Sequence, residues 1–352
     1  MIFENTKRVN EIVTKNYTIS TFAHIIIIIT GLKLASGIIL PFLMAFFLFI
    51  IFLPLINKLN SFSIPNVISL LLVFAIIIIV IFLPTIFIVS SNNDIIKDIP
   101  IYQDKFHKVI PQIIAFFEQY NIFLEWNTIL SLIEPAKIIN YITTLFQGMG
   151  NITINLLLTL ALFIFLLLES SAISNKISYF TKTNEQKQKV ELFIKSINRY
   201  FIIKTFTSAL TGLMVWALLE YFNLQYALLF AVLAFLLNYI PSIGSFIAAF
   251  PPVFVSMLQL SMIETIIIAI VYLIINILIG SFLDPKIMGK DLGISTFVVF
   301  TSMVIWGWIF GPFGMLLAVP LTIIIKIICD NSKHYHWVSV ILSDKGEFNE
   351  KY

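Results

Sequence analysis

The chain has 352 residues, of which 59% are hydrophobic and only 12% are charged, and its mean hydropathy is +0.98. Soluble domains carry about a quarter charged residues, so this composition excludes a soluble protein and predicts an integral membrane protein. The formal net charge is +3, and the lysines are scattered rather than gathered on one basic face, which argues against nucleic acid as a partner.

The N-terminal quarter predicts a short tail followed by three membrane-spanning helices. Residues 1–18 are polar and charged, and we expect a cytoplasmic tail without a cleaved signal peptide. The apolar runs within 19–91 suffice for three transmembrane helices, since one span needs about 20 residues. A turn is expected between the first two, at Gly31–Lys33 and Ser36–Gly37, because a lysine at mid-bilayer costs roughly 2.5–3.5 kcal/mol. The third is expected at Val67–Val89.

The next segments differ in the sign of their charge. Residues 92–146 carry six acids against four lysines, with apolar residues every three or four positions, which predicts a small helical domain outside the membrane. A fourth span is expected within 147–168. Residues 169–204 hold seven basic groups against three acids, and excess Lys and Arg marks cytoplasmic loops. We therefore expect 169–204 to be a cytoplasmic amphipathic segment, with a helix at 185–203 lying along the inner membrane surface or against the bundle. The 92–146 domain then faces outward.

Residues 205–328 are predicted to be the transport core. Two uninterrupted spans are expected there, at Phe206–Phe222 and Thr265–Leu283. Two longer apolar stretches contain helix-breaking residues. Ala227–Met257 is interrupted at Asn238–Gly244 and again at Pro251-Pro252, and Phe297–Ile328 is interrupted at Gly311–Gly314.

Two topologies fit these interruptions. Either both long stretches cross the membrane fully, or each forms a re-entrant hairpin with its Pro/Gly break at the tip. The loop Asp284–Asp291 lies outside in the first arrangement and inside in the second. Its two lysines favour the inside, and we therefore favour the hairpins. Both arrangements leave residues 329–352 as a cytoplasmic tail. The predicted fold class is an all-α, polytopic helix bundle.

The interruptions supply the candidate pathway residues. In hydrocarbon, irregular backbone survives only where protein or a watery cavity covers it, and broken helices hold ions and polar solutes in many transporters. The alternative is a buried polar kink satisfied by neighbouring helices. The candidate substrate or ion pathway comprises Asn238, Pro241, Ser242, Gly244, Ser245, Asp284, Pro285, Lys286, Gly289, Gly311 and Gly314.

Acids in the core are candidates for proton coupling, because a coupled carrier needs a carboxylate whose pKa changes with access to either side. These candidates are Asp284, Glu220 and Glu264. The last two lie near predicted span ends, where solvated carboxylates are the simpler interpretation. Asp284 and Lys286 flank Pro285 and are expected to form either a gate loop with internal ion pairs or an interfacial loop.

No cofactor or metal is expected. The spacing of His334, His336 and Cys329 fits no closed metal site, and the chain has no Walker A loop for ATP. The single cysteine excludes a disulfide within the chain.

Three motifs in the C-terminal half resemble the autoinducer-2 exporter family of bacterial inner-membrane permeases. They are Leu236–Gly244 (LLNYIPSIG), Asp284–Lys290 (DPKIMGK) and Gly311–Pro320 (GPFGMLLAVP). The resemblance covers nearly the whole chain. It implies a multi-pass secondary transporter, since members are described as exporters of the quorum-sensing signal or as sodium/proton antiporters. Two departures stand out: Asp284 replaces a small polar residue, and Ser295-Thr296 replaces a His-Pro pair.

The function predicted from these features is secondary transport by alternating access. The chain would export a small polar, autoinducer-like solute or exchange a monovalent cation for protons. The alternative is a passive channel or a membrane scaffold. An intramembrane enzyme is disfavoured because the four histidines avoid the core and no H-E-x-x-H run exists. Membrane lipid is an expected partner, and a homo-oligomer is compatible with the apolar helices.

Overall fold

The computed structural model describes residues 23–80 except 25, 153–170, 183–241, 243–288, 293–330 and 335–344, with single positions at 105, 111, 118–119, 172–173, 176 and 179. Within these ranges the chain is helical, and its only extended pairing is one isolated bridge between Ile294 and Ser343. The predicted all-α class is confirmed. The tail at 1–18, half of the tail at 329–352 and, apart from the single positions named above, the predicted domain at 92–146 lie outside the described residues.

The first apolar run does not turn back on itself as predicted. Residues 26–34 are helical, and α2 (Ser36–Ser61) follows with only Ala35 between them. The Ala35 amide donates to the Gly31 carbonyl at 2.9 Å, and the Ile39 amide donates to the Ala35 carbonyl at 2.9 Å, so helical bonding passes through the junction. Lys33 is accommodated by a tertiary contact instead of a boundary. Its ammonium donates to the Trp308 carbonyl and lies 5.2 Å from the centre of the Trp308 ring.

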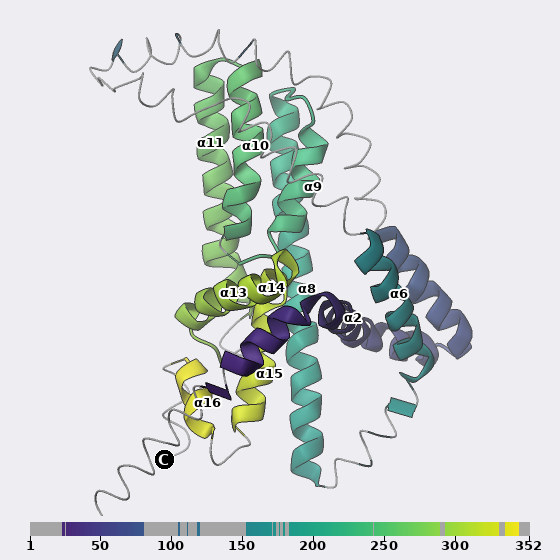
Figure 1. The fold of residues 1–352 in the computed structure, drawn as a ribbon. Coiled ribbons are helices and arrows are strands. Elements are labelled where there is room, and N and C mark those ends of the chain that lie inside the picture. Colours follow the sequence, from purple (N-terminus) through teal and green to yellow (C-terminus); the bar gives the residue numbers. More distant parts are fainter. Residues whose placement is uncertain are drawn as a thin grey trace, which may run out of the picture.

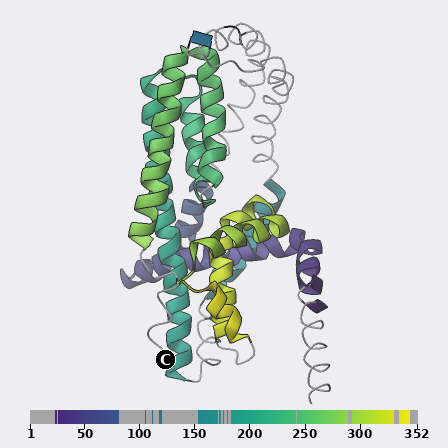
Figure 2. The ribbon, with the colours of Figure 1, turned by 90° about the vertical axis from the view of Figure 1, so that its left-hand side faces the viewer.

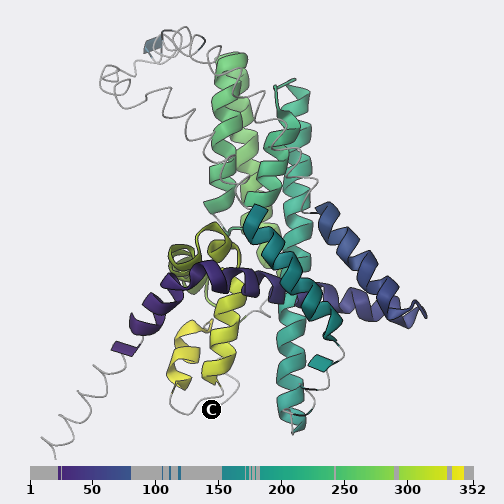
Figure 3. The ribbon, with the colours of Figure 1, turned by 45° about the vertical axis from the view of Figure 1, so that its right-hand side comes forward.

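The N-terminal helices form one layer, which extends from one side of the molecule across its middle (Figure 1). It contains α2, the helix Asn66–Val80 and α6 (Thr153–Leu168). These helices share an apolar core in which Ala45, Val73 and Phe163 are fully buried. α2 lies across the long axis of the tallest helix, α8 (Asn184–Tyr221), as the views in Figures 1 and 3 agree.

α8 (Asn184–Tyr221) is a single helix of 38 residues. At 1.5 Å per residue it is about 57 Å long, and it extends well beyond the helices that pack on its upper part (Figure 1). The predicted boundary between a surface helix at 185–203 and a span at Phe206–Phe222 is therefore wrong. No proline or glycine interrupts the chain between 184 and 211, so nothing in the sequence ends the helix where its polarity changes.

Three helices pack beside the upper half of α8, in alternating directions (Figures 1 and 2). They are α9 (Ala227–Leu237), α10 (Ile243–Gln259) and α11 (Met262–Asn276). Their shared core contains fully buried Leu219, Phe230 and Tyr272. The predicted second break at Pro251-Pro252 is wrong, because both prolines lie inside α10. A proline removes one backbone donor and bends a helix, but α10 continues on both sides of the two prolines.

α11 continues without a loop into a π-helix and a short α-helix, η1 (Ile277–Leu283) and α12 (Asp284–Met288). The loop predicted to begin at Asp284 is therefore helical over its first five residues. A π-helix forms i→i+5 bonds and is rare in proteins. Here it joins two α-helical segments and carries the chain to Asp284, at the side of α8.

The last long apolar stretch folds back. α13 (Thr296–Phe310) ends at Gly311, α14 (Pro312–Leu316) makes one turn, and α15 (Ala318–Asp330) leads away, followed by α16 (His336–Leu342). α13 contacts both α14 and α15. Three described helices are long and apolar enough to cross a membrane, judged by length and composition: Ser36–Ser61, Val190–Tyr221 and Met262–Leu283.

Candidate functional site

The tip of the first helical hairpin, formed by α9 and α10, is closed by a glycine that no other residue can replace. α9 ends at Leu237, and the Ile240 amide donates to the Leu237 carbonyl at 2.9 Å. α10 begins at Ile243, so the predicted break at Asn238–Gly244 is a tight turn between two helices. A Cβ atom on Gly244 would lie 1.8 Å from the Leu237 carbonyl oxygen, well inside contact distance. Glycine is required here for close backbone approach.

The second tip uses the same device. A Cβ atom on Gly314 would lie 1.9 Å from the Trp306 carbonyl oxygen. Gly311, which ends α13, has φ +69° and open space around it, so its role is conformational. The two predicted glycines of this tip therefore act differently. Gly311 permits the turn of the backbone, and Gly314 permits the close packing of the two helical segments that the turn connects.

The two tips touch one another. Ile240 at the first tip lies in one buried apolar cluster with Met303 and Ala318 of the second hairpin. Leu237, Ile243, Trp306 and Met315 pack around this cluster. Two interrupted segments that are far apart in the sequence therefore form a single contact near the centre of the molecule.

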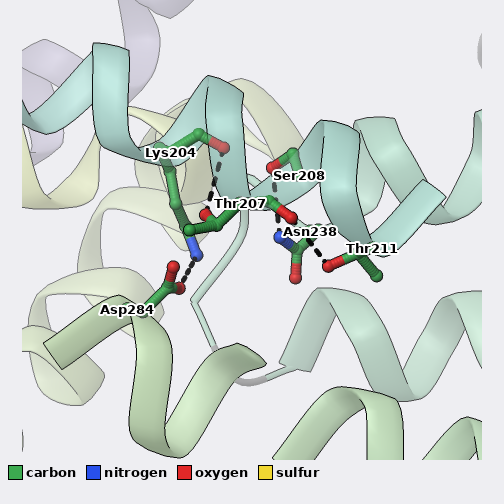
Figure 4. A network of polar contacts seen from close by, with 6 residues as sticks. All are labelled: Lys204, Thr207, Ser208, Thr211, Asn238 and Asp284. Carbon is green, nitrogen blue, oxygen red and sulfur yellow. Dashed lines mark hydrogen bonds and ion pairs between the residues drawn. The ribbon is translucent and has the colours of Figure 1, made fainter. Parts of the chain in front are cut away.

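Polar side chains form a stripe along the face of α8 that looks toward the first tip. Its buried members are Lys204, Thr207, Ser208 and Thr211. Spacings of three and four place these residues on one side of a helix. The Thr207 hydroxyl donates to the Lys204 carbonyl at 3.3 Å, and the Thr211 hydroxyl donates to the Thr207 carbonyl at 2.9 Å. Figure 4 shows the four side chains on their helix.

A charged pair lies at one end of this stripe. The Lys204 ammonium lies 2.6 Å from Asp284 Oδ2, and the two side chains are only 6% and 10% exposed. Lys204 is about 21 Å along α8 from Val190 and about 26 Å from Tyr221, at 1.5 Å per residue. Both ions therefore sit near the middle of the apolar helix. Charges in such places are costly and mark functional pathways when they occur.

The first hairpin tip reaches the stripe through its asparagine. Asn238 Nδ2 donates to Ser208 Oγ at 3.1 Å, and Asn238 is itself buried. The next residue makes a second link, in which the Tyr239 hydroxyl donates to Thr205 Oγ1 at 2.8 Å. Figure 4 shows Asn238 directed at α8, beside the Lys204–Asp284 pair. The structure thus brings together Asn238 and Asp284, which were predicted separately.

Several buried polar atoms around this stripe have no hydrogen-bond partner among the described residues. On α8 they are Asn198 Oδ1 and the Tyr200 hydroxyl, and on the facing helix they are both amide atoms of Asn276 and Asp284 Oδ1. An unsatisfied buried polar group costs about 1–3 kcal/mol. Their position beside an ion pair makes this part of the structure the candidate site for a polar ligand.

The remaining predicted residues lie outside the polar stripe of α8. Glu220 is exposed, and Glu264 is half-buried and caps α11, where its carboxylate accepts from the Ser261 amide at 2.9 Å. Lys286 is exposed, and Asp284 pairs with Lys204 rather than within its own segment. Ser245 lies in the first turn of α10, Pro241 in the tip and Pro285 on α12. Ser242 and Gly289 fall outside the described residues.

The residues that sequence reasoning missed are those of the polar stripe of α8, including Lys204, which was grouped with the basic cytoplasmic cluster, and Asn276 on α11. A signal for the stripe exists in the sequence. Tyr200, Lys204, Ser208 and Thr211 recur at spacings of four, four and three in a run that is otherwise largely apolar, and this pattern places a polar line on one helical face. A metal site built from several side chains is not seen in the part of the chain that the structure describes, which contains no group of three or more His, Cys, Asp or Glu side chains suited to a metal ion.

Comparison with known proteins adds the family context. The sequence model of the family described as "AI-2E family transporter" matches residues 22–334. The chain is 32% identical to AI-2 transport protein TqsA of Escherichia coli over 321 residues, which cover 91% of this chain and 93% of TqsA. It is also 32% identical to a protein of Haemophilus influenzae (94% and 97% covered) and 31% identical to YhhT of E. coli (91% and 92% covered), both of which carry names of transport proteins.

Proposed function

The chain belongs to the AI-2E transporter family, and we propose that it moves a small polar solute, or exchanges a monovalent cation for protons, by alternating access. Members of this family are transport proteins, so the chain is a membrane transporter and not an enzyme. The solute, the coupling ion and the direction belong to the proposal. So do the bacterial inner membrane as location and cytoplasmic positions for both termini.

One observation carries this proposal: the buried polar stripe of α8 faces the tip of a broken helix. Lys204, Ser208 and Asn238 are buried together with Asp284 inside an otherwise apolar bundle. Nothing in the packing of a membrane protein requires an ion pair there, since a well-packed apolar pair is often as stable as a buried salt bridge. Interrupted helices whose ends meet polar side chains are the usual substrate and ion sites of secondary transporters.

The contact between the two hairpin tips supplies the gate that alternating access needs. Ile240, Met303 and Ala318 close an apolar seal beside the polar stripe. We propose that the tips separate on one side of the membrane while the opposite side stays packed. Separation would expose Asn238 and the α8 stripe to water, and renewed contact would isolate them. The proposal favours the arrangement in which both interrupted stretches enter and leave the membrane on the same side.

Among the predicted acids, Asp284 supports a coupling role best. It is buried and paired with Lys204, whereas Glu220 is exposed and the Glu264 carboxylate caps the first turn of α11. A carboxylate couples transport to an ion gradient when its charge is neutralised in one state and free in another. Asp284 has such a neutralising partner in Lys204. The relative that is named AI-2 transport protein supports a small polar, autoinducer-like solute as the first cargo to test.

The experiment that tests the proposed function is flux in proteoliposomes made with the purified protein. Labelled autoinducer-2 and radioactive sodium are tested as cargo, each with imposed proton or sodium gradients. Replacing Asn238 by Leu should lower flux at least tenfold, because the variant loses the hydrogen bond to Ser208 and places an apolar side chain in the pathway. Asn66→Leu is the matched control, since Asn66 is exposed and lies away from the stripe, in the N-terminal layer.

Two results would contradict the proposal. Flux that persists unchanged after both gradients are collapsed would exclude coupling to a proton or sodium gradient. Single-channel currents at ordinary voltages would favour the passive channel. Unchanged flux in Asn238→Leu would show that Asn238 at the first tip is not part of the transport pathway. Flux that follows an imposed gradient, and that fails in Asn238→Leu but not in Asn66→Leu, is the result we expect.

A further inference from the structure

Three buried oxygen atoms on the helix α11–η1–α12 lack partners among the described residues. The Tyr272 hydroxyl lies in the apolar core, whereas Asp284 Oδ1 and Asn276 Oδ1, on residues that are 7% and 9% exposed, belong to an acid and an amide. The amide nitrogen of Asn276 likewise has no partner among the described residues. Burial without partners is costly for each atom, so a ligand that contacts Asp284 and Asn276 would remove this cost.

The π-helix η1 connects these two residues. Asn276 is the last residue of α11, η1 occupies Ile277–Leu283, and Asp284 follows directly. π-helical segments are uncommon and occur frequently at functional sites. η1 and α12 both contact α8, as does α11. The π-helical segment therefore lies between two unsatisfied oxygen ligands, on an element that packs against the helix carrying Lys204.

Lys204 satisfies only half of the carboxylate. Its ammonium bonds Asp284 Oδ2 at 2.6 Å, while Oδ1 has no hydrogen-bond partner among the residues that the structure describes. Carboxylate and amide oxygens are hard ligands, of the kind that small non-transition cations select. An ammonium on a long side chain carries the same single charge as an alkali ion and is tethered beside the ligands. Either cation neutralises Asp284, and two cations on one carboxylate repel each other, so binding of the small cation weakens the hold of the ammonium.

We propose that Asp284 and Asn276 form a binding site for a small monovalent alkali cation, and that Lys204 is a tethered competitor which occupies this site in the present conformation. The proposal deepens the proposed function, on which it rests, by naming the cation site and its internal substitute. When the cation binds, Lys204 swings away toward the polar stripe; when the cation leaves, Lys204 returns. Asp284 is then paired with a cation in both states, and the displaced ammonium must be held by the hydroxyl oxygens of the stripe or by water, because an unpaired buried charge is expensive.

The test measures binding rather than transport. The melting temperature of the purified full-length protein in detergent is followed as sodium chloride replaces choline chloride at constant ionic strength, at fixed pH. A ligand that binds the folded state raises stability as its concentration passes its Kd. In the wild type, sodium must displace Lys204. In Lys204→Met the competitor is absent, and we expect the half-saturating sodium concentration to fall at least tenfold.

Two further variants make the result specific. Lys204→Met combined with Asp284→Asn should lose the sodium response, because the charged ligand is gone, and Lys204→Met combined with Asn276→Leu should weaken it. If Lys204→Met does not fold, Lys204→Gln and binding of radioactive sodium to the wild type and to Asp284→Asn answer the same question. Three results would each overturn the proposal. The first is an equal melting temperature of the lysine variants in sodium and in choline, and the second is a melting temperature that responds to pH alone. The third is a sodium response that survives in the Asp284→Asn variant.

The outcome is separable from that of the flux experiment. A sodium-dependent shift without gradient-driven flux would overturn the transport mechanism and support the cation site. Flux without any cation-dependent shift would do the reverse.

Discussion

Asp284 Oδ2 accepts a hydrogen bond of 2.6 Å from Lys204, a residue 80 positions earlier in the chain, and both side chains are almost completely buried. The pair joins the middle of the longest helix to the end of the π-helical segment. Burial makes the two charges dependent on each other, because either alone would lie unpaired in apolar surroundings. This relationship links the fold, the candidate pathway and the predictions below.

The first prediction concerns the stability of this pair. Lys204→Met and Asp284→Asn should each destabilise the protein, the former by about 3–5 kcal/mol, because removing one partner leaves an uncompensated buried charge. The measurement is thermal or denaturant unfolding of the purified variants in detergent. Lys204→Met leaves the Asp284 carboxylate without its partner, and Asp284→Asn leaves the Lys204 ammonium without its partner. We therefore expect both single variants to lose transport.

The neutral double variant Lys204→Met with Asp284→Leu separates the two roles of the pair. It should regain most of the stability, since replacing a buried ion pair by apolar side chains is often neutral, but it should not regain transport. Recovery of transport in the neutral variant would show that the charges have only a structural role.

The second prediction concerns the two tip glycines. Gly244→Ala and Gly314→Ala should lower the free energy of unfolding by about 3 kcal/mol or prevent folding, because each Cβ atom would meet a backbone carbonyl at under 2 Å. Gly37→Ala in α2 is the control, since nothing lies within 4 Å of its Cβ position. It should leave stability unchanged or raise it slightly. Equal melting temperatures for all three variants would contradict the tip geometry.

The third prediction concerns the contact between the tips. Cys329 is replaced by Ser, and cysteines are placed at Ile240 and Ala318, which share one buried cluster. A short bifunctional thiol reagent should join the two hairpins and reduce transport at least tenfold, since the gate can no longer open. The comparison pair places one cysteine at Ile240 and the other at exposed Phe297. Full activity after complete joining of the first pair would exclude a gating motion at this contact.

The fourth prediction concerns membrane topology. In the cysteine-free background, Lys286→Cys should react with an impermeant thiol reagent only from the cytoplasmic side, because the hairpin arrangement returns the chain to that side after α11. Lys286 is exposed, so its accessibility depends on the surrounding membrane rather than on the protein. Intact cells and everted vesicles provide the two sides. Labelling of intact cells from outside would require both interrupted stretches to cross fully.

The sequence predicted the features that depend on local backbone chemistry. The break at Asn238–Gly244 and the fold-back at Gly311–Gly314 both appear in the structure, because proline and glycine act on the backbone wherever they occur. The all-α class followed from hydropathy alone. Pro251-Pro252 shows the limit of this reasoning, since a buried helix continues through both residues.

The features that depend on tertiary contact were not predictable from local pattern. Lys33 was expected to mark a helix boundary, but contact with Trp308 accommodates it within a helix. Lys204 was assigned to a cytoplasmic basic segment, because its partner lies on another helix. A lysine in an apolar run is costly only when unpaired, and one sequence does not reveal the pairing.

The fifth prediction concerns access of water to the α8 stripe, and its measurement tests the central claim most directly. Single cysteines at Ser208 and at Val215 are compared in native membranes, in the cysteine-free background. Both positions are fully buried on the same helix, but Ser208 lies in the polar stripe and Val215 in the apolar core. A transport pathway predicts that a charged, impermeant methanethiosulfonate modifies the cysteine at 208 and leaves the cysteine at 215 intact. Equal and complete protection of both positions would contradict the account.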